Sequence, residues 1–353
     1  MPRLAVLTGS PGTVPDAVSA ALVAHAGFAV RHLPIAADAP PRPEDARGAE
    51  VIVHLGCRTP RDLDEDARAR VEHAVARAAA LLARDAGARR CIHVSTAAVY
   101  GRARNLPCRE GELKSPRTAH ERIRWCAEQG SWSAFRSGAP LVVLRPTPMY
   151  GPTLLGGPVR ALALVSLFNQ HHRRVPILRR GPVAHLLHVD DLARAVVHVA
   201  LHPADADVVG RAFNVGDDAP LPLAEHVAAA LSALGYQPGR VLPALPRVYA
   251  FLLWLFRHVP DRVLLDPINR RLLRGWRALG GRRPGAGGLL SPRIEREALH
   301  WMARDHYYDT SRLRAIGWRP AHPISTTALP DVVRALVATR RLPDPGTPAL
   351  PAW

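Results

Sequence analysis

The first half of the chain alternates short runs of β-forming residues with longer alanine-rich stretches, and this alternation constrains the fold more than any other feature. Such a pattern is typical of strand-helix-strand units, which build a parallel sheet covered by helices. We expect strands at residues 4–9, 28–35, 50–56, 90–96 and 141–147. We expect helices between them at residues 14–27, 67–87 and 117–130. The sequence therefore predicts a doubly wound α/β sheet with the Rossmann-like arrangement.

The charge of the chain does not identify a partner. A formal net charge of +17 suggests nucleic acid or an anionic membrane surface. However, Lys114 is the only lysine, and all other positively charged side chains are arginines. Such usage indicates a codon bias that is spread over the whole surface, so we do not expect nucleic-acid binding.

Cysteine spacing and hydrophobicity bear on metal binding and location. The four cysteines do not have the spacing of a zinc site or a redox pair, and we expect no metal. They are Cys57, Cys91, Cys108 and Cys126. The N-terminal residues lack the long apolar segment of a signal peptide, and no run reaches the ~18 apolar residues that span a bilayer. We expect a cytoplasmic protein, and peripheral contact with a membrane stays open.

Two glycines follow the first predicted strand directly. Gly9 and Gly12 lie between that strand and a helix, where small residues let the backbone approach a pyrophosphate. The start of the helix adds N–H groups and a positive dipole. Pro15 occupies the place of a third glycine, which the first turn of a helix tolerates. The loop predicts a dinucleotide site, and a plain tight turn is the alternative.

The second predicted strand lacks the acidic residue that binds the adenosine ribose in many dinucleotide enzymes. Pro34 stands at that place, and Asp38 comes too late in the chain to replace it. Arg31, His32 and Arg58 are basic residues that can neutralise a 2′-phosphate. We therefore favour NADP over NAD. Few residues separate this strand from the next, so we expect no full helix between them.

Six motifs, in this order, resemble the extended short-chain dehydrogenase/reductase family, which includes NAD-dependent epimerases and dehydratases. They are TGSPG, EVIVHLGC, CIHVSTAAVYG, LRPTPMYGP, LLHVDDLARAV and RAFNVGDD. The segment at residues 290–320 is most similar to the 3β-hydroxysteroid dehydrogenase branch. The resemblance covers residues 1–335 and implies a dimer and a nicotinamide cofactor. Taken with the loop and the charges above, it places the cofactor against Gly9, Ser10, Gly12, Thr13, Arg31, His54, Leu55 and Gly56.

In this family a Ser or Thr orients the substrate oxygen, a Tyr transfers the proton, and a Lys four residues later binds the nicotinamide ribose. A Glu follows that Lys by four residues. Counting back from Glu128 puts Arg124 at the Lys position and His120 at the Tyr position. Thr96, four residues before Tyr100, falls at the Ser/Thr position. The resemblance thus implies an atypical catalytic set that lacks the Tyr and Lys pair.

The spacing of His120 and Arg124 places both on one helix face. Arg124 keeps the positive charge of a lysine but does not release a proton. His120, with an ordinary pKa near 6.5, can donate or accept a proton near neutral pH. As an alternative, His120 is a solvated surface residue and Arg124 reflects the scarcity of lysine. Lys114 offers no other pair, because Glu110 precedes it by four residues.

Two later motifs favour structural roles. We interpret His188, Asp190 and Asp191 as the cap and acidic first turn of a helix at residues 190–202, rather than as catalytic groups. Asn214 is interpreted as a turn or helix-positioning residue.

The second half of the chain is expected to hold the substrate region. We assign residues 1–152 and 183–216 to the dinucleotide-binding domain, 153–182 and 217–335 to the substrate region, and 336–353 to a proline-rich tail. Aromatic and aliphatic residues flanked by arginines at residues 248–260 and 270–279 indicate an element that lies on lipid or covers an apolar ligand. A core helix is the alternative for this element.

Two functions follow from this reading. The first is an atypical NAD(P)-dependent oxidoreductase that interconverts a secondary alcohol and a ketone on an apolar, sterol-, lipid- or polyketide-like substrate. The second is a non-catalytic member of the family that binds a dinucleotide and serves in binding or assembly.

Overall fold

The computed structural model of the chain divides into two compact units. The first comprises Met1–Pro148, Leu187–Gly216 and Tyr307–Ala321, and the second comprises Met149–Leu186, Asp217–His306 and His322–Trp353. The structure describes residues 3–36, 39, 41–57, 63–156, 159–160, 162–164, 174–178, 181–242, 251, 254–255, 258–280, 289–296, 301 and 304–342. Asp38 and Arg58, which the sequence analysis considered as cofactor contacts, lie outside these residues.

A six-stranded parallel sheet, in the order β10-β5-β4-β3-β1-β2, forms the centre of the first unit. Its strands are β1 (Arg3–Thr8), β2 (Phe28–Leu33), β3 (Ala49–His54), β4 (Arg90–Val94), β5 (Leu141–Pro146) and β10 (Arg211–Val215). Every residue of β4 and β5 is buried, as expected where helices cover both faces of a parallel sheet.

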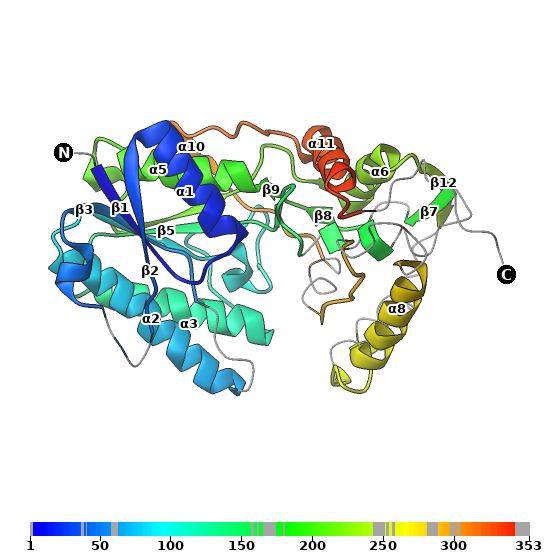
Figure 1. The fold of residues 1–353 in the computed structure, drawn as a ribbon, viewed down its shortest axis with the longest axis horizontal. Coiled ribbons are helices and arrows are strands. Elements are labelled where there is room, and N and C mark those ends of the chain that lie inside the picture. Colours follow the sequence, from blue (N-terminus) through cyan, green and yellow to red (C-terminus); the bar gives the residue numbers. More distant parts are fainter. Residues whose placement is uncertain are drawn as a thin grey trace. The chain divides into compact units, whose positions relative to one another are not determined.

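Four long helices cover this sheet. Figure 1 shows α1 (Thr13–Ala26) and α5 (Val189–Leu201) on one face, and α2 (Glu65–Asp85) and α3 (Ala119–Phe135) on the other. Each strand and helix that the sequence predicts for the first half is present. The predicted doubly wound α/β fold is therefore confirmed.

The start of α3 is fixed by its own side chains. Thr118 and Glu121 form a capping box, in which the Glu121 N–H donates to the Thr118 hydroxyl at 3.2 Å and the Thr118 N–H donates to the Glu121 carboxylate at 3.0 Å. The neighbouring α2 is capped by Asp64, whose carboxylate accepts from the Ala67 N–H at 2.6 Å. Because His120 lies in the first turn of α3, this cap sets where its side chain emerges.

The strand order reverses beside β1, because β2 lies on one side of it and β3 on the other. The connection between β2 and β3 contains the single turn η1 (Pro43–Ala46) and, within its described residues, no α-helix. This agrees with the short connection that the sequence indicates. The carboxyl ends of β1 and β3 therefore border the switch point of the sheet, where ligands bind in folds of this class.

Smaller elements complete the first unit. They are η2 (Ala97–Tyr100), β9 (Leu187–His188), η3 (Asp205–Asp207) and α10 (Ser311–Ala315). The segment Tyr307–Ala321, expected in the substrate region, packs in this unit instead. The reason is backbone pairing: the Cys108 N–H donates to Tyr307 at 3.0 Å, and the Asp309 N–H donates to Cys108 at 2.9 Å.

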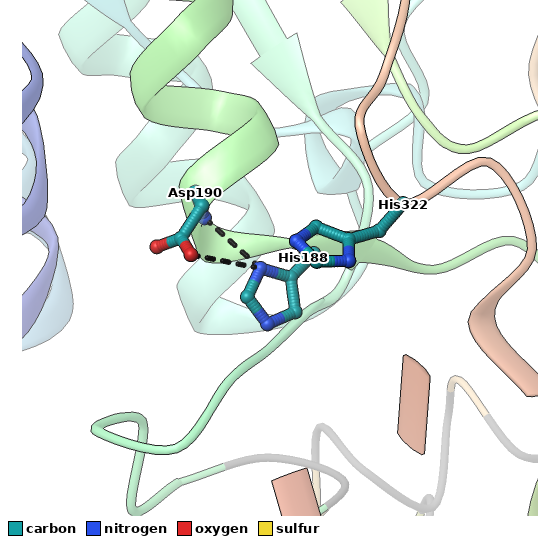
Figure 2. Close-up of side chains that lie close together, drawn as sticks. All are labelled: His188, Asp190 and His322. Atoms are coloured by element: carbon teal, nitrogen blue, oxygen red, sulfur yellow. Dashed lines mark hydrogen bonds and ion pairs between the residues drawn. The ribbon is translucent and has the colours of Figure 1, made fainter. Parts of the chain in front are cut away.

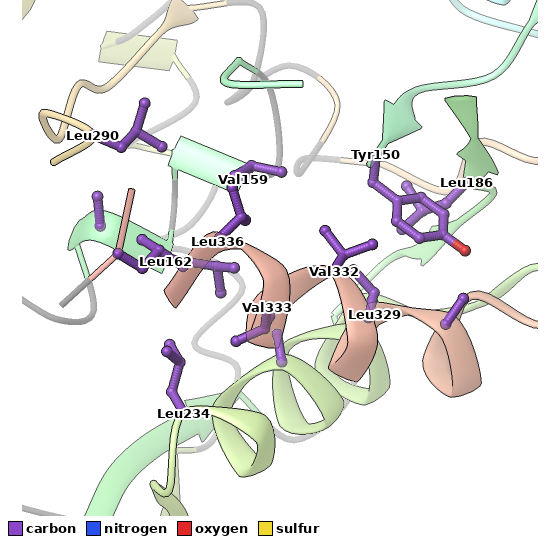
Figure 3. Packing of buried hydrophobic residues seen from close by; sticks show 14 of the residues in the cluster. Tyr150, Val159, Leu162, Leu186, Leu234, Leu290, Leu329, Val332, Val333 and Leu336 are labelled. Atoms are coloured by element: carbon purple, nitrogen blue, oxygen red, sulfur yellow. The ribbon is translucent and has the colours of Figure 1, made fainter. Parts of the chain in front are cut away.

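The second unit has a helical core. Its strands are β6 (Met149–Tyr150), β7 (Arg174–Leu178), β8 (Val183–Ala184), β11 (Leu221–Pro222) and β12 (Gln237–Leu242), and its helices are α6 (Leu223–Ala233), α8 (Leu265–Gly280) and α11 (Ser325–Ala338). β12 pairs with β7 in parallel, and β11 pairs with β8 antiparallel. Figure 3 shows how Leu329, Val332, Val333 and Leu336 of α11 fill the core of this unit.

The C-terminal tail begins later than the sequence suggests. We assigned residues 336–353 to a tail, but α11 continues to Ala338, and Leu336 and Leu342 are buried in the core of the second unit. Residues 343–353 lie outside the described part of the chain. Among the described helices, none has the length and apolar character that crossing a bilayer requires.

Candidate functional site

The turn after β1 lies against the end of β3. The Ser10 N–H donates to the Gly56 carbonyl at 3.1 Å, and the Leu55 N–H donates to the Thr8 carbonyl at 2.9 Å. Gly9 has a φ of 126°, and a Cβ added there would lie 2.3 Å from the Gly56 oxygen. A glycine is therefore required at position 9.

The start of α1 is open beside this turn. Gly12 precedes the helix, and a Cβ added to it would meet no described protein atom within 4 Å. The Asp16 N–H donates to the Gly12 carbonyl at 3.0 Å, so the helix begins regularly although Pro15 lies in its first turn. A helix start carries a partial positive charge and N–H groups that suit an anion. Gly9, Ser10, Gly12 and Thr13 therefore fit the pyrophosphate of a dinucleotide.

The guanidinium of Arg124 lies over the backbone of Gly56. Gly56 has a φ of 82°, and a Cβ added to it would lie 2.3 Å from Arg124 Nη1. The same nitrogen lies 3.5 Å from the carboxylate of Glu72 on α2. The structure thus brings together two predicted site residues, from α3 and from the end of β3. A fixed positive charge stands next to the glycine turn.

His120 lies one turn before Arg124 and is exposed to water. The surrounding protein nevertheless lowers its pKa to about 4, first through desolvation and then through the positive charges of Arg124 and Arg68. The ring is therefore neutral at pH 7, and it can accept a proton only as a weak base. Exposure also agrees with the alternative that His120 is a solvated surface residue.

Thr96 follows the end of β4 and is half-buried. Its hydroxyl caps η2 by accepting from the Ala98 N–H at 3.2 Å. A hydroxyl that accepts one bond can still donate another, so the cap does not prevent contact with a substrate oxygen. β4 lies beside β3 in the sheet, and His93 pairs in register with His54. Thr96 and Gly56 therefore lie at the same edge of the sheet.

The other predicted cofactor residues differ in exposure. Arg31 is exposed on β2 and donates to the Asp45 carbonyl at 3.1 Å. His54 is 1% exposed, its Nδ1 lies 2.9 Å from the Thr8 hydroxyl, and its ring lies 5.3 Å from that of His93. Burial, with help from the charges of His93 and Arg124, holds its pKa well below the usual value. His54 therefore ties β3 to β1 as a neutral side chain.

A buried polar network, which the sequence does not reveal, lies behind this edge. Arg145 on β5 binds the carboxylate of Glu128 on α3 through Nη2 at 2.6 Å and Nε at 3.1 Å. It also donates from Nη1 to the Tyr100 hydroxyl at 2.7 Å, and that hydroxyl donates to Asn214 Oδ1 at 2.7 Å. All four side chains are at most 3% exposed. The network fixes α3 against the sheet.

The titration of these groups agrees with a structural role. Burial raises the pKa of Tyr100 above its ordinary value, although Arg145 opposes the shift. Burial also disfavours the charged form of Glu128, but Arg145 and the hydrogen bonds from Ser95 and Trp132 outweigh it and lower its pKa. Tyr100 is therefore a neutral side chain whose hydroxyl is held by Arg145 and Asn214.

Lys114, the only lysine, lies in this region although no motif contains it. Its ammonium donates to the carbonyls of Glu110 and Glu112 at 2.8 and 2.7 Å, and it stands 5.0 Å from the centre of the Tyr100 ring. Burial first, and then the charge of Arg145, lowers its pKa to about 8. Its rarity in the chain is the one sequence signal that singles it out.

Both later motifs have structural roles, but only the first has the role that we favoured. Figure 2 shows His188 and Asp190 at the start of α5, where the His188 Nδ1 accepts from the Asp190 N–H at 3.3 Å. Asp191 is fully buried and accepts from the Ala321 N–H at 2.6 Å. Asn214 lies in β10, not in a turn, and its amide donates to the Cys108 and Asp309 carbonyls at 3.0 and 3.1 Å. It positions two loops rather than a helix.

Solved structures with the same fold cover nearly the whole chain. A short-chain dehydrogenase/reductase superfamily protein from Agrobacterium tumefaciens with bound NAD is 19% identical, over 96% of this chain and 100% of that one, with a TM-score of 0.63. The terminal R domain from the myxalamid PKS-NRPS biosynthetic pathway is 17% identical, over 98% and 93%, with a TM-score of 0.67. RMD from Pseudomonas aeruginosa complexed with NADPH is 16% identical, over 94% and 99%, with a TM-score of 0.61. At these identities the likeness establishes the fold.

Among curated proteins, no sequence matches this chain. The model of the NAD dependent epimerase/dehydratase family matches residues 43–216. That range contains Gly56, Glu72, Thr96, His120 and Arg124. The part of the chain that forms most of the candidate site therefore carries the sequence pattern of the NAD dependent epimerase/dehydratase family, on a Rossmann-like α/β fold.

Proposed function

We propose that this protein is an atypical NAD(P)-dependent oxidoreductase that interconverts a secondary alcohol and a ketone on an apolar substrate. The observation that carries the proposal is the position of Arg124, whose guanidinium stands over Gly56 beside the open start of α1. A positive charge at a glycine turn of a switch point suits an anionic dinucleotide. The related structures that hold NAD or NADPH support the same cofactor class.

The chain supplies binding, orientation and proton transfer, and a bound nicotinamide supplies the hydride. Gly9, Gly12 and the start of α1 would hold the phosphates, and Arg124 would bind the ribose and, through its positive charge, the phosphate next to it. Thr96 would donate a hydrogen bond to the substrate oxygen. His120 would accept the hydroxyl proton as a weak base, because the ring is neutral at pH 7.

The substrate class rests on the similarity of residues 290–320 to the hydroxysteroid dehydrogenase branch. The exposed aromatic side chains of the second unit add support. Phe251 and Trp254 are 59% and 53% exposed, and their rings stack at 6.2 Å. Exposed aromatic groups of this kind mark surfaces that meet apolar partners. We favour NADP because Arg31 is exposed on β2, where a 2′-phosphate would lie.

A fluorescence titration with NADPH and NADH tests cofactor binding. We expect saturable quenching of the tryptophan emission and a loss of affinity of at least tenfold in Arg124→Ala. Arg122→Ala is the matched control, because Arg122 lies on the same helix and pairs with Glu65 of α2 instead of Glu72. Equal affinity of both variants would overturn the role of Arg124. His120→Ala should abolish alcohol oxidation and leave the dinucleotide affinity unchanged.

The second candidate function is a dinucleotide-binding family member without catalysis. One observation favours it: Tyr100, the tyrosine of the CIHVSTAAVYG motif, is buried, and its hydroxyl is bonded to Arg145 and Asn214. Proton transfer then depends on His120 alone. Saturable dinucleotide binding without turnover of any secondary alcohol or ketone would select this function over the first.

A further inference from the structure

Arg124 lies between the backbone of Gly56 and the carboxylate of Glu72. Its Nη1 lies over the Gly56 backbone, which is also the acceptor for the Ser10 N–H of the glycine turn. The same nitrogen is 3.5 Å from the Glu72 carboxylate. The guanidinium is 31% exposed, whereas Glu72 is 4% exposed. The cation can therefore be reached from solution, and its carboxylate partner cannot.

A buried carboxylate depends on its countercharge to remain ionised. Among the described residues, the groups that face Glu72 are Arg124 of α3, Arg68 of its own helix, and the thiol and backbone of Cys57 beyond β3. His54 of β3 and His93 of β4, behind Arg124, are kept neutral by burial. His120 is neutral as well. Burial already raises the pKa of Glu72, and Arg124 provides the largest opposing effect.

An anion at the glycine turn would compete for this cation. The turn and Arg124 meet at one residue, Gly56, so a phosphate bound by Gly9 and Gly12 would lie close to the partly exposed guanidinium. We propose that Glu72 and the dinucleotide compete for Arg124, so that binding of the cofactor is coupled to uptake of a proton by Glu72. Glu72 is then a positioning residue, which holds Arg124 at the turn until the cofactor takes it over. The inference rests on the proposed dinucleotide binding.

The coupling has a defined sign. Before binding, the guanidinium favours the carboxylate form of Glu72. After binding, the positive charge is shared with phosphate, the carboxylate loses part of its support, and its pKa rises further. Binding therefore takes up protons, and the affinity falls as the pH rises. The fall reaches tenfold per pH unit where a full proton is taken up, and it vanishes at a pH above both pKa values.

Calorimetric titration of the full-length protein with NADPH, at one pH and in buffers of different ionisation enthalpy, measures this uptake directly. We expect the observed enthalpy to vary with the buffer, with the sign of proton uptake. Glu72→Gln, which keeps the shape of the side chain, should abolish the variation. Arg124→Gln should abolish it too, because Glu72 is then protonated before the cofactor arrives. Glu65→Gln is the matched control, since Glu65 pairs α2 with Arg122 in the same way at an exposed position.

The outcomes separate the two proposals. Binding without any buffer dependence would overturn the coupling and leave the proposed cofactor binding intact. Uptake that persists in Glu72→Gln but disappears in His120→Ala would assign the proton to His120 and overturn the role of Glu72. Absence of binding for both NADPH and NADH would overturn the proposed function and the coupling with it. Uptake in the wild type and in Glu65→Gln, but in neither Glu72→Gln nor Arg124→Gln, supports the proposal.

Discussion

The substitution Tyr100→Phe tests whether the tyrosine of the CIHVSTAAVYG motif is structural or catalytic. It removes one hydroxyl that accepts from Arg145 at 2.7 Å and donates to Asn214 at 2.7 Å. Each buried polar group left without its partner costs about 1–3 kcal/mol. Arg145 keeps its bonds to Glu128 and to the Glu110 carbonyl, so the cost of its one lost bond lies near the lower end of this range. We therefore expect the free energy of unfolding to fall by about 2–4 kcal/mol.

Urea unfolding followed by circular dichroism measures this change, and a dinucleotide titration under native conditions measures any change at the site. A fall of this size leaves most of the protein folded, because domains of ordinary stability unfold with about 5–15 kcal/mol. A double-mutant cycle with Asn214→Ala isolates the shared bond. The reasoning would be refuted by unchanged stability together with a loss of turnover, since Tyr100 would then act on substrate.

Three further predictions concern other parts of the chain. Gly9→Ala should weaken dinucleotide binding and lower the free energy of unfolding, because its Cβ would lie 2.3 Å from the Gly56 oxygen. Gly111→Ala is the control and should change neither property, because a Cβ there has no described neighbour within 4 Å. Melting curves and dinucleotide titrations compare the two variants. The pKa of Lys114 should lie near 8, which the ¹³C-methyl resonance of the lysine after reductive methylation would measure. The unfolded chain keeps this proton to higher pH, so the free energy of unfolding should rise from pH 8 to about 10. The rise should be absent in Lys114→Met. The wild-type protein should co-sediment with anionic vesicles, because exposed arginines of α8 attract the lipid surface; they are Arg270, Arg271, Arg274 and Arg277. Replacing the exposed Phe251 and Trp254 by serine should abolish this co-sedimentation. Equal sedimentation of the wild type and the variant would exclude a membrane contact through these aromatic groups.

The sheet and its helices could be predicted because their signals are local. The β-forming runs, the glycines after β1 and the capping box before α3 act within a few residues. The order of the motifs then placed Gly9, Gly56, Thr96 and Arg124 at one edge. The parallel strands bring their ends together there, as the register of β1, β3 and β4 shows.

Partners that lie far apart in sequence could not be predicted. Glu72 is 52 residues from Arg124, and on an alanine-rich helix it has the look of an ordinary surface residue. Lys114 reaches the Tyr100 ring only through the path of the loop between η2 and α3. The pairing of Cys108 with Tyr308 joins segments with no periodic pattern between them. Each of these contacts depends on tertiary structure, which no local rule describes.

The buried pair of Glu128 and Arg145 also bears on how such a protein changes over time. Loss of either partner strands a charge in the interior, at a penalty of about 3–5 kcal/mol, so neither position accepts a single replacement easily. His120 and Arg124 lie in the first two turns of the same helix, where Arg124 pairs with Glu72 and not with Glu128. The buried pair therefore holds α3 on the sheet, whereas the predicted catalytic residues lie in the first two turns of the helix. A tyrosine at position 120 and a lysine at position 124 can therefore be introduced while the pair of Glu128 and Arg145 keeps the position of the helix.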